Sequence, residues 1–449
     1  MPLVRLSFEN YRCFSKRQNL ELRPITVVLG KNNSGKSALV RAPLVLSTGF
    51  DSDSSLPLDL EQLGEHAPDF VDLIHNRVEH GSVSFGLEVE VPEQAIGKSF
   101  DPDSAGSHGM TFPLTIGIDV TIQNVAEWHS QVVSRWTLRS PEGTTSLEWI
   151  PEDEAGEEDS HPYSVTGNDL LSHVSSVAFK GLLPANRSRA MPDDLTRSPF
   201  PDGRGWLVRA GLDRIRHLGP FRTRPNRVGR LTARLPSQDD DSGTDTVPIL
   251  IYDHVRRGGR LITKINEYLG EHIPGWELEV VPRYDAYSVG LKSKATAGLW
   301  VPATDTGTGV AQVLPILVRR ARDELDPPVH SILEIVEEPE LHLHPSGQAA
   351  LADLYVTATQ RTPVRFLIET HSETFLLRLR RRVAEGKVDP DMIALYFVEH
   401  TGVSATVRRI NVDDLGNVDY WPQGIFAEDF EETRALAAAQ LGRQDTDAR

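Results

Sequence analysis

The string GKNNSGKS at residues 30–37 constrains this chain more than any other feature, because it follows an apolar run at residues 25–29. It fits the pattern G-x-x-x-x-G-K-[ST], which predicts a phosphate-binding loop between a strand and a helix. Gly30 and Gly35 let the backbone turn so that successive N–H groups face an anion, and a helix over residues 36–46 would present its positive N-terminus to that anion. The alternative, a glycine-rich turn without a ligand, explains neither the strand before the loop nor the helix after it.

The residues of this loop are predicted to bind a nucleotide and Mg²⁺ in different ways. Lys36 would reach the β- and γ-phosphates, and the Ser37 hydroxyl would ligate Mg²⁺. The other loop residues would contact the nucleotide, and they are Gly30, Asn32, Asn33, Ser34, Gly35 and Ala38. We therefore expect a nucleotide and Mg²⁺ at this loop, and the family resemblance given below implies that the nucleotide is ATP.

Composition places the chain in a broad class and a compartment. Its 449 residues are 39% hydrophobic and 25% charged, which fits a well-packed protein of one large domain or two to three ordinary ones. The single cysteine, Cys13, excludes an intrachain disulfide and a cysteine-based metal site. No apolar run approaches the roughly 18 residues of a membrane span, so we expect a cytoplasmic protein without membrane contact.

Arginine is concentrated in one segment of an otherwise acidic chain. The net charge of -17 disfavours a surface covered by nucleic acid. Between Arg187 and Arg234, however, there are twelve arginines and four aspartates, a net charge of +8. These arginines either pair with the acidic stretches at residues 152–159 and 239–245, or form a surface for nucleic acid or an acidic partner, since guanidinium groups suit bidentate pairing.

The spacing of apolar residues predicts the secondary structure around the loop. Alternating apolar and polar residues predict strands of an antiparallel sheet at residues 3–8, 83–91, 114–122 and 132–138. Polar, acidic or Gly/Ser-rich segments predict loops at residues 101–109, 151–161 and 236–246. A helical pattern spans residues 262–269, and strands alternate with helices after residue 331. The last part of the chain is therefore predicted to be α/β.

These patterns divide the chain into four predicted regions. They are a discontinuous core of residues 1–50 and 300–425, an antiparallel β-rich lobe of residues 51–180, an arginine-rich inserted and partner-binding region of residues 181–299, and a C-terminal helix and tail of residues 426–449.

A second motif, SILEIVEEPELHLHP at residues 331–345, places two acids at the end of a predicted strand. In a doubly wound sheet such residues face the ligand, so Glu337 would hold the Mg²⁺ shell and Glu338 would orient or deprotonate the attacking water. His342 and His344 could be metal ligands beside these acids. We favour instead a turn against which a dimer partner packs.

Two further segments are predicted to lie near the γ-phosphate. In FLIETHS, residues 366–372, a short strand ends at His371, which could hydrogen-bond a γ-phosphate oxygen, and Ser372 caps the next helix. In DTGTGVAQ, residues 305–312, glycines precede a predicted helix at residues 313–318 and would form a second anion site. Because one nucleotide rarely needs two such loops in one chain, we expect a head-to-head dimer in which this loop covers ATP bound to the other protomer.

The order of these motifs resembles the ABC-type ATPase heads of the SMC, RecF and OLD class, especially the compact OLD-like AAA proteins of bacterial defence operons. NYRCF at residues 10–14 and LGPFR at residues 218–222 are similar to further segments of that class. The resemblance implies an α/β P-loop NTPase fold with a mixed or parallel sheet, flanking helices, an antiparallel β subdomain and an inserted middle region. It also implies roles for individual residues: nucleotide contacts by Arg12, metal coordination by Ser37 and Glu337, catalysis by Glu338 with Lys36, a switch role for His371, and a loop acting in trans with Gly307, Gly309 and Gln312.

The chain departs from the pattern of that class at several positions. Glu337 stands where an aspartate is usual, and Ala311 stands where the trans-acting loop usually has a serine. The metal-sensing glutamine has no clear counterpart, with Gln62 as the one candidate. We expect neither a long coiled coil nor a nuclease domain in this chain.

The motifs together predict an ATP-hydrolysing molecular switch. It would form a homodimer or a higher even oligomer around ATP and control a separately encoded effector, a nuclease or toxin, in antiphage defence. One alternative is a RecF-like repair ATPase that loads onto DNA, with nucleic acid bound through Arg187–Arg234. Another is an ATP-binding scaffold with little turnover, which Glu337 and Ala311 make conceivable.

Overall fold

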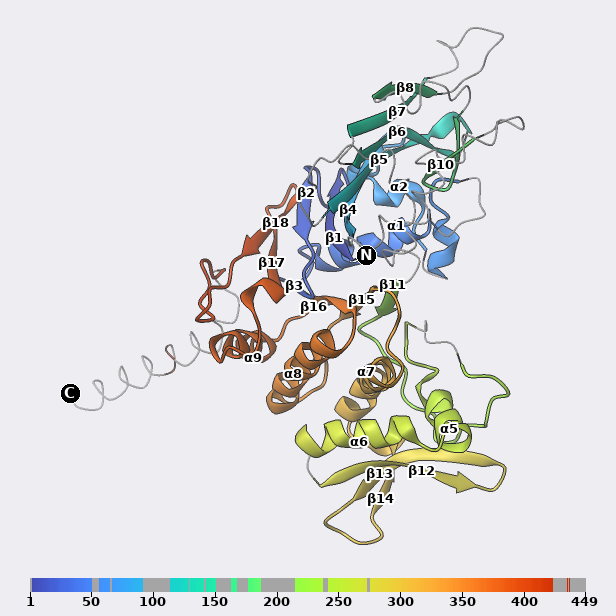
Figure 1. Cartoon of the computed structure of the whole chain (residues 1–449), viewed down its shortest axis with the longest axis vertical. Coiled ribbons are helices and arrows are strands. Elements are labelled where there is room, and N and C mark those ends of the chain that lie inside the picture. Colours follow the sequence, from blue (N-terminus) through green and yellow to red (C-terminus); the bar gives the residue numbers. More distant parts are fainter. Residues whose placement is uncertain are drawn as a thin grey trace, which may run out of the picture.

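The computed structural model describes most of the chain. The described residues are 2–50, 56–64, 67–91, 114–128, 130–140, 143–150, 163–167, 177–186, 215–236, 241–272, 275–422, 434 and 436. They form an elongated molecule with an antiparallel sheet at one end, a central sheet backed by helices, and a small three-stranded sheet at the other end (Figure 1). Among these residues no helix is long and apolar enough to cross a membrane.

The central sheet has six strands in the order β11-β15-β16-β3-β17-β18. The first five are parallel and the edge strand β18 is antiparallel. The strands are β3 (Ile25–Gly30), β11 (Ile215–Leu218), β15 (Ile332–Glu337), β16 (Val364–Glu369), β17 (Ile393–His400) and β18 (Ala405–Ile410). Every residue of β3 and β15 is buried, as expected for inner parallel strands covered on both faces. The predicted α/β core is therefore confirmed.

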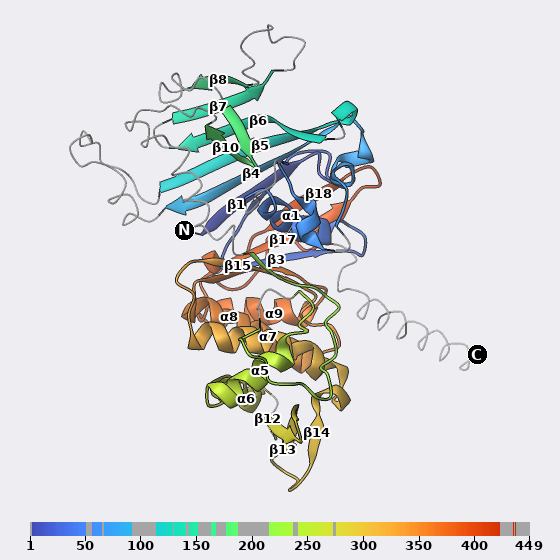
Figure 2. The same cartoon turned by 90° about the vertical axis from the view of Figure 1, so that its right-hand side faces the viewer.

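Helices cover the two faces of this sheet unequally (Figure 2). The helices are α1 (Lys36–Ser47), α7 (Thr308–Leu325), α8 (Pro345–Arg361) and α9 (Glu373–Ala384). On one face Ile25, Val27 and Leu29 of β3 pack in a core with residues of α7, α8 and α9. On the other face Val28 packs in a second core with α1 and the antiparallel sheet. The strand that leads into the phosphate loop therefore separates two hydrophobic cores.

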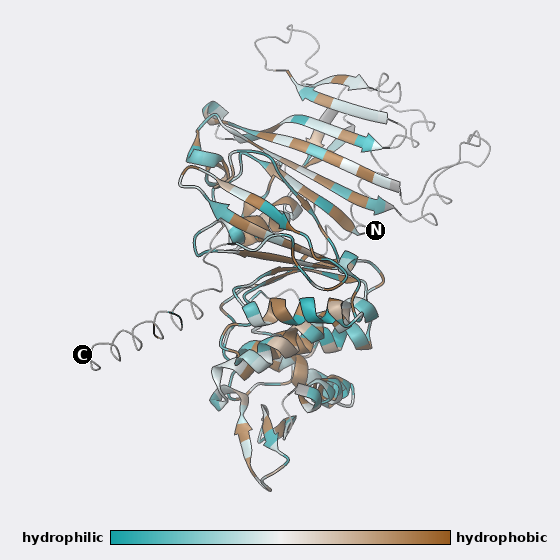
Figure 3. Cartoon of the chain, turned by 90° about the vertical axis from the view of Figure 1, so that its left-hand side faces the viewer, coloured by the Kyte–Doolittle hydropathy of each residue, from teal (hydrophilic) through white to brown (hydrophobic). Residues whose placement is uncertain are grey.

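The antiparallel sheet has seven strands in the order β2-β1-β4-β5-β6-β7-β8. They are β1 (Leu3–Glu9), β2 (Gln18–Glu21), β4 (Ser82–Val91), β5 (Leu114–Val125), β6 (Ser130–Ser140), β7 (Gly143–Trp149) and β8 (Tyr163–Gly167). Figure 3 shows the alternation of hydrophilic and hydrophobic residues along these strands, on which the sequence prediction relied. The boundary predicted at residue 50 divides this sheet, because β1, which precedes the boundary, pairs antiparallel with β4, which follows it.

The middle of the chain contributes both to the centre and to the far end of the molecule. The far end consists of α5 (Thr246–Arg256), α6 (Arg260–His272), β12 (Trp276–Arg283), β13 (Ala286–Ser293) and β14 (Trp300–Pro302). Shorter elements are α2 (Phe70–Leu73) and the hairpin of β9 (Val177–Lys180) and β10 (Leu183–Asn186). The edge strand β11 also comes from the region predicted to be an insertion, and it pairs in parallel with β15. The predicted loops at residues 101–109 and 151–161 lie outside the described residues, as does the C-terminal tail apart from residues 434 and 436.

A buried ionic cluster joins β11, β15 and α7. Glu334, the one charged residue inside the apolar run of β15, is fully buried and pairs with Arg320 and Arg216, the latter at 3.1 Å. Arg216 also pairs with Asp323 at 2.8 Å. Burial alone would raise the pKa of Glu334, but the arginines around it hold that pKa below its usual range. The cluster therefore keeps a charged carboxylate in the interior.

Replacing Glu334 with alanine is expected to destabilise the protein by about 3–5 kcal/mol, because the arginines around it would lose their buried counter-charge. Denaturant unfolding monitored by circular dichroism measures this loss. The matched control is Glu277→Ala, which removes a half-exposed pair with Lys294 at 2.8 Å and should change stability by about 1 kcal/mol or less. Equal effects of the two variants would contradict the prediction.

Candidate active site

The phosphate loop has the strand–loop–helix geometry that the sequence predicts. β3 ends at Gly30 and α1 begins at Lys36. Gly35 has a φ of 106°, and a Cβ atom at this position would lie 2.5 Å from the sulfur of Cys13. A side chain at Gly35 would therefore force the loop away from the N-terminal segment, so only glycine fits.

Lys36 and Ser37 both face a carboxylate that the sequence analysis did not single out. Lys36 is buried, its Nζ donates a hydrogen bond to the carbonyl of Lys31 at 2.8 Å, and it lies 3.9 Å from Glu369 Oε1. The Ser37 hydroxyl donates to the same Glu369 oxygen at 3.0 Å. Burial lowers the pKa of Lys36. One feature of the sequence could have identified Glu369 as a site residue. It lies at the end of the apolar strand β16, two residues before His371.

Glu369 has the properties of a cation ligand. It is 3% exposed, and its second oxygen, Oε2, is buried without a hydrogen-bond partner among the described residues. Burial, followed by the negative charge of Glu337, raises the pKa of Glu369 to about 7. An orphaned carboxylate oxygen beside a serine hydroxyl fits a divalent cation, because hard cations prefer oxygen ligands.

Glu338 and His371 complete a cluster with Glu369. Ligand atoms of the three residues all lie within 4.8 Å of one another, and His371 Nε2 is 3.9 Å from Glu338 Oε1. Burial and then the charge of Lys36 lower the pKa of His371 to about 4, so its imidazole is neutral at pH 7. The structure thus brings together Lys36, Ser37, Glu338 and His371 as predicted, and it adds Glu369.

Glu337 lies in a different environment from the one predicted. Arg41 on α1 donates to both of its carboxylate oxygens at 2.6 and 2.7 Å, and His217 on β11 contacts one of them at 2.7 Å. Burial would raise the pKa of Glu337, but these neighbours lower it. Because both oxygens are already engaged, the geometry favours Glu369 over Glu337 as the acid that shares a metal with Ser37.

The glycine-rich segment at residues 305–312 is helical earlier than predicted. Gly307 is the N-cap and α7 begins at Thr308, so Gly309 lies in the first turn. A Cβ atom on Gly309 would lie 2.7 Å from the carbonyl oxygen of His342, which explains why glycine occurs inside the helix. Gln312 is buried and its amide donates to the carbonyl of Arg222 at 2.9 Å. Its side chain is thus directed into its own chain rather than toward a second protomer.

Three other predicted residues have local structural contacts. His344 caps α8 by accepting a hydrogen bond from the backbone of Ser346, which agrees with the turn rather than the metal interpretation. Arg12 has a φ of 48° in the N-terminal turn, and its backbone N–H donates to the carbonyl of Leu73 at 2.7 Å. Gln62 is exposed and donates to Asp59 at 3.0 Å. None of these contacts involves the loop at residues 30–37.

Residues 187–214, the first part of the arginine-rich segment, lie outside the described residues. In the described part, Arg216 and Arg222 are buried, and Arg227 pairs with Asp305 at 2.7 Å. Arg230 pairs with Asp285 at 3.1 Å. Intramolecular pairing with Asp323, Glu334, Asp305 and Asp285 is therefore observed for this part, and the predicted acidic stretch at residues 152–159 lies outside the described residues.

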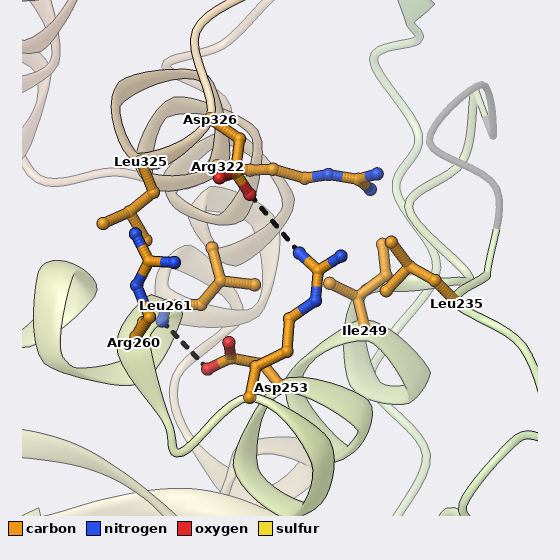
Figure 4. Close-up of a pocket in the computed structure, with 9 residues that line it drawn as sticks. Leu235, Ile249, Asp253, Arg260, Leu261, Arg322, Leu325 and Asp326 are labelled. Carbon is orange, nitrogen blue, oxygen red and sulfur yellow. Dashed lines mark hydrogen bonds and ion pairs between the residues drawn. The ribbon is translucent and has the colours of Figure 1, made fainter.

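A small pocket lies at the junction of α5, α6 and the end of α7 (Figure 4). Its charged residues contact one another or the backbone: Arg257 pairs with Asp326 at 3.3 Å, and Asp253 accepts the backbone N–H of Leu261 at 2.9 Å. The residues that line it include neither the phosphate loop nor the acids at the end of β15. This pocket is therefore separate from the candidate active site.

The parallel sheet, the phosphate loop and the acids at its edge define a P-loop nucleotide-binding protein of the ATPase type. Residues 25–378 match the model of the family described as "AAA domain, putative AbiEii toxin, Type IV TA system", and the chain belongs to this family. Residues 388–436 match a second family, "Protein of unknown function (DUF3696)". No curated protein matches the chain.

Solved structures of SMC heads are similar to the chain at low identity. An SMC head bound to the C-winged helix domain of ScpA is 12% identical, with 92% of this chain and 98% of that chain covered and a TM-score of 0.47. The SMC head domain from Thermotoga maritima is 12% identical, with 92% and 100% covered and a TM-score of 0.42. An Smc head with an extended coiled coil, bound to the C-terminal domain of ScpA derived from Pyrococcus furiosus, is 10% identical, with 91% and 96% covered and a TM-score of 0.45.

Proposed function

We propose that this chain binds ATP at residues 30–37 and hydrolyses it as a molecular switch. The observation that carries the proposal is the convergence of Lys36, Ser37, Glu338, Glu369 and His371 at one edge of the central sheet. Turnover of ATP by the purified chain, measured as phosphate release, tests it directly. Tight ATP binding without turnover would support the scaffold alternative instead.

The residues of the cluster would divide the chemistry between them. Ser37 and Glu369 would hold Mg²⁺, which neutralises charge on the phosphates during transfer. Glu338 would accept the proton of the attacking water, since its carboxylate lies at the open edge of the cluster and is about one-third exposed. His371, neutral at pH 7, would donate a hydrogen bond to a γ-phosphate oxygen. Lys36 would bind the same phosphate electrostatically.

Glu369→Gln is expected to raise the Mg²⁺ concentration needed for half-maximal hydrolysis by about 10- to 100-fold, the range found for residues that support a metal site. Titrating Mg²⁺ in an ATPase assay measures this shift. The matched control is Glu399→Gln, because Glu399 is an exposed glutamate near the end of the neighbouring strand β17. If Glu369→Gln needs the same Mg²⁺ concentration as the wild type, Glu337 is the better candidate for the Mg²⁺ ligand.

We further propose that the chain dimerises head-to-head around ATP and controls a separately encoded toxin or nuclease in the cytoplasm. The description of the family names a putative toxin of a toxin–antitoxin system, and this supports a place for the chain in such a system. Copurification of the tagged chain with untagged products of the adjacent genes, with and without ATP, tests it. Salt-dependent DNA binding without such a complex would favour the repair ATPase.

A further inference from the structure

Arg222 is a buried cation that the proposed chemistry does not use. It follows β11 in the segment LGPFR and is 4% exposed. Its Nη2 donates to the backbone carbonyl of Glu337 at 2.9 Å and to that of Glu338 at 3.4 Å. The guanidinium therefore lies directly against the backbone that carries the proposed catalytic base.

The same side chain also contacts the start of α7. Arg222 Nη1 donates to the carbonyl of Gln312 at 3.4 Å, and the amide of Gln312 donates back to the carbonyl of Arg222 at 2.9 Å. Gln312 lies in the second turn of α7, whose N-cap is Gly307. Reciprocal hydrogen bonds thus link the N-terminal turns of α7 to the acidic turn through one buried residue.

Glu338 has a backbone conformation that depends on its surroundings. Its φ is 44°, in the left-handed region, which is unfavourable for a non-glycine residue. Such a conformation persists only where several contacts fix it. For Glu338 these contacts include its N–H, which donates to the carbonyl of Glu369 at 2.8 Å, and its carbonyl, which accepts from Arg222.

We propose that Arg222 is a positioning residue that couples the N-terminal turns of α7 to the orientation of Glu338. This inference rests on the proposed head-to-head dimer, together with the sequence-based prediction that the loop at residues 305–312, which includes the N-terminus of α7, covers ATP bound to the second protomer. A shift of α7 on contact with that nucleotide would move Gln312, and through Arg222 it would move the backbone of Glu338. Hydrolysis in one site would then respond to the nucleotide contact made by the same chain in the other site.

A kinetic double-mutant cycle tests this coupling. Arg222→Lys keeps the positive charge but removes the planar guanidinium group. A lysine amine cannot donate at the same time to the carbonyls of Glu337 and Glu338 and to that of Gln312 on α7. Gln312→Ala removes the reciprocal contact from the other side and leaves a good helix former. Each single variant is expected to lower kcat at least about tenfold while ATP affinity, measured with a fluorescent analogue, stays within about twofold. The double variant should lose no more than the worse single variant, because both act through one connection.

Several outcomes separate this inference from a purely structural role and from the proposed function. Arg224→Lys is the matched control, because Arg224 is exposed two residues away, and its kcat should equal that of the wild type. Losses that multiply in the double variant, or a loss of ATP affinity at unchanged kcat, would overturn the coupling alone. If Arg222→Lys does not fold, as judged by thermal unfolding, the kcat of Gln312→Ala decides the matter. A wild-type chain that does not hydrolyse ATP would overturn both proposals.

Discussion

Lys36→Ala is expected to abolish ATP hydrolysis and to weaken ATP binding at least about tenfold. The hydrogen bond of a charged group contributes about 1.5–3 kcal/mol, and 1.4 kcal/mol corresponds to a tenfold change in affinity. In the structure Lys36 is buried, and its amine lies between the Lys31 carbonyl and Glu369. It is therefore already held inside the loop where the phosphates would bind. Isothermal titration with ATP and a phosphate-release assay measure the two effects.

A lysine outside the loop provides the control for this prediction. Lys16 is exposed in the N-terminal turn, so Lys16→Ala should leave both quantities unchanged. Unchanged turnover in Lys36→Ala would eliminate the ATPase proposal as a whole, because Lys36 is the cation that lies 3.9 Å from Glu369 and whose charge lowers the pKa of His371.

Glu338→Gln should separate ATP binding from hydrolysis. The amide keeps the size and hydrogen-bonding capacity of the carboxylate but cannot accept a proton, and loss of a general base lowers kcat by about 10²- to 10⁴-fold. ATP binding should persist, so the head-to-head dimer should accumulate when ATP is added. Light scattering after size exclusion detects the dimer, and a single-turnover assay measures the residual rate.

The fold of this variant can be checked independently of its activity. Its melting temperature should match that of the wild type, since the Glu338 side chain is partly exposed and its backbone contacts do not need the carboxylate. A variant that hydrolyses ATP at the wild-type rate would exclude Glu338 as the base and direct attention to Glu369.

Local patterns predict the phosphate loop and its flanking elements well. The strand at residues 25–29, the helix from residue 36 and the strand that leads into the acidic pair Glu337 and Glu338 are all present. Each depends on a run of neighbouring residues whose periodicity is visible in the sequence. The alternating strands at residues 83–91 and 114–122 were predictable for the same reason.

The contacts between these elements were not predictable, because strand order determines them. Glu369 reaches Ser37 because β16 lies beside β3, and Arg222 reaches the acidic turn because the four-residue strand β11 lies beside β15. So short a strand has no measurable periodicity. The environment of the Glu337 carboxylate likewise depends on a distant contact, because its partner Arg41 lies on α1, far from Glu337 in the sequence. The early start of α7 reflects packing against His342, which overrides the low helix propensity of Gly309.

The position of β3 in the central sheet has a consequence for biosynthesis. β3 is made early, yet both of its neighbours, β16 and β17, come from the last quarter of the chain. Contacts so distant in sequence form slowly, and domains generally fold as units during synthesis. A nascent chain that has exposed only its first 300 residues therefore carries the phosphate loop without the strands that support it. We therefore expect the chain to bind ATP only after synthesis has passed β17, so that ATP binding marks a completed central sheet.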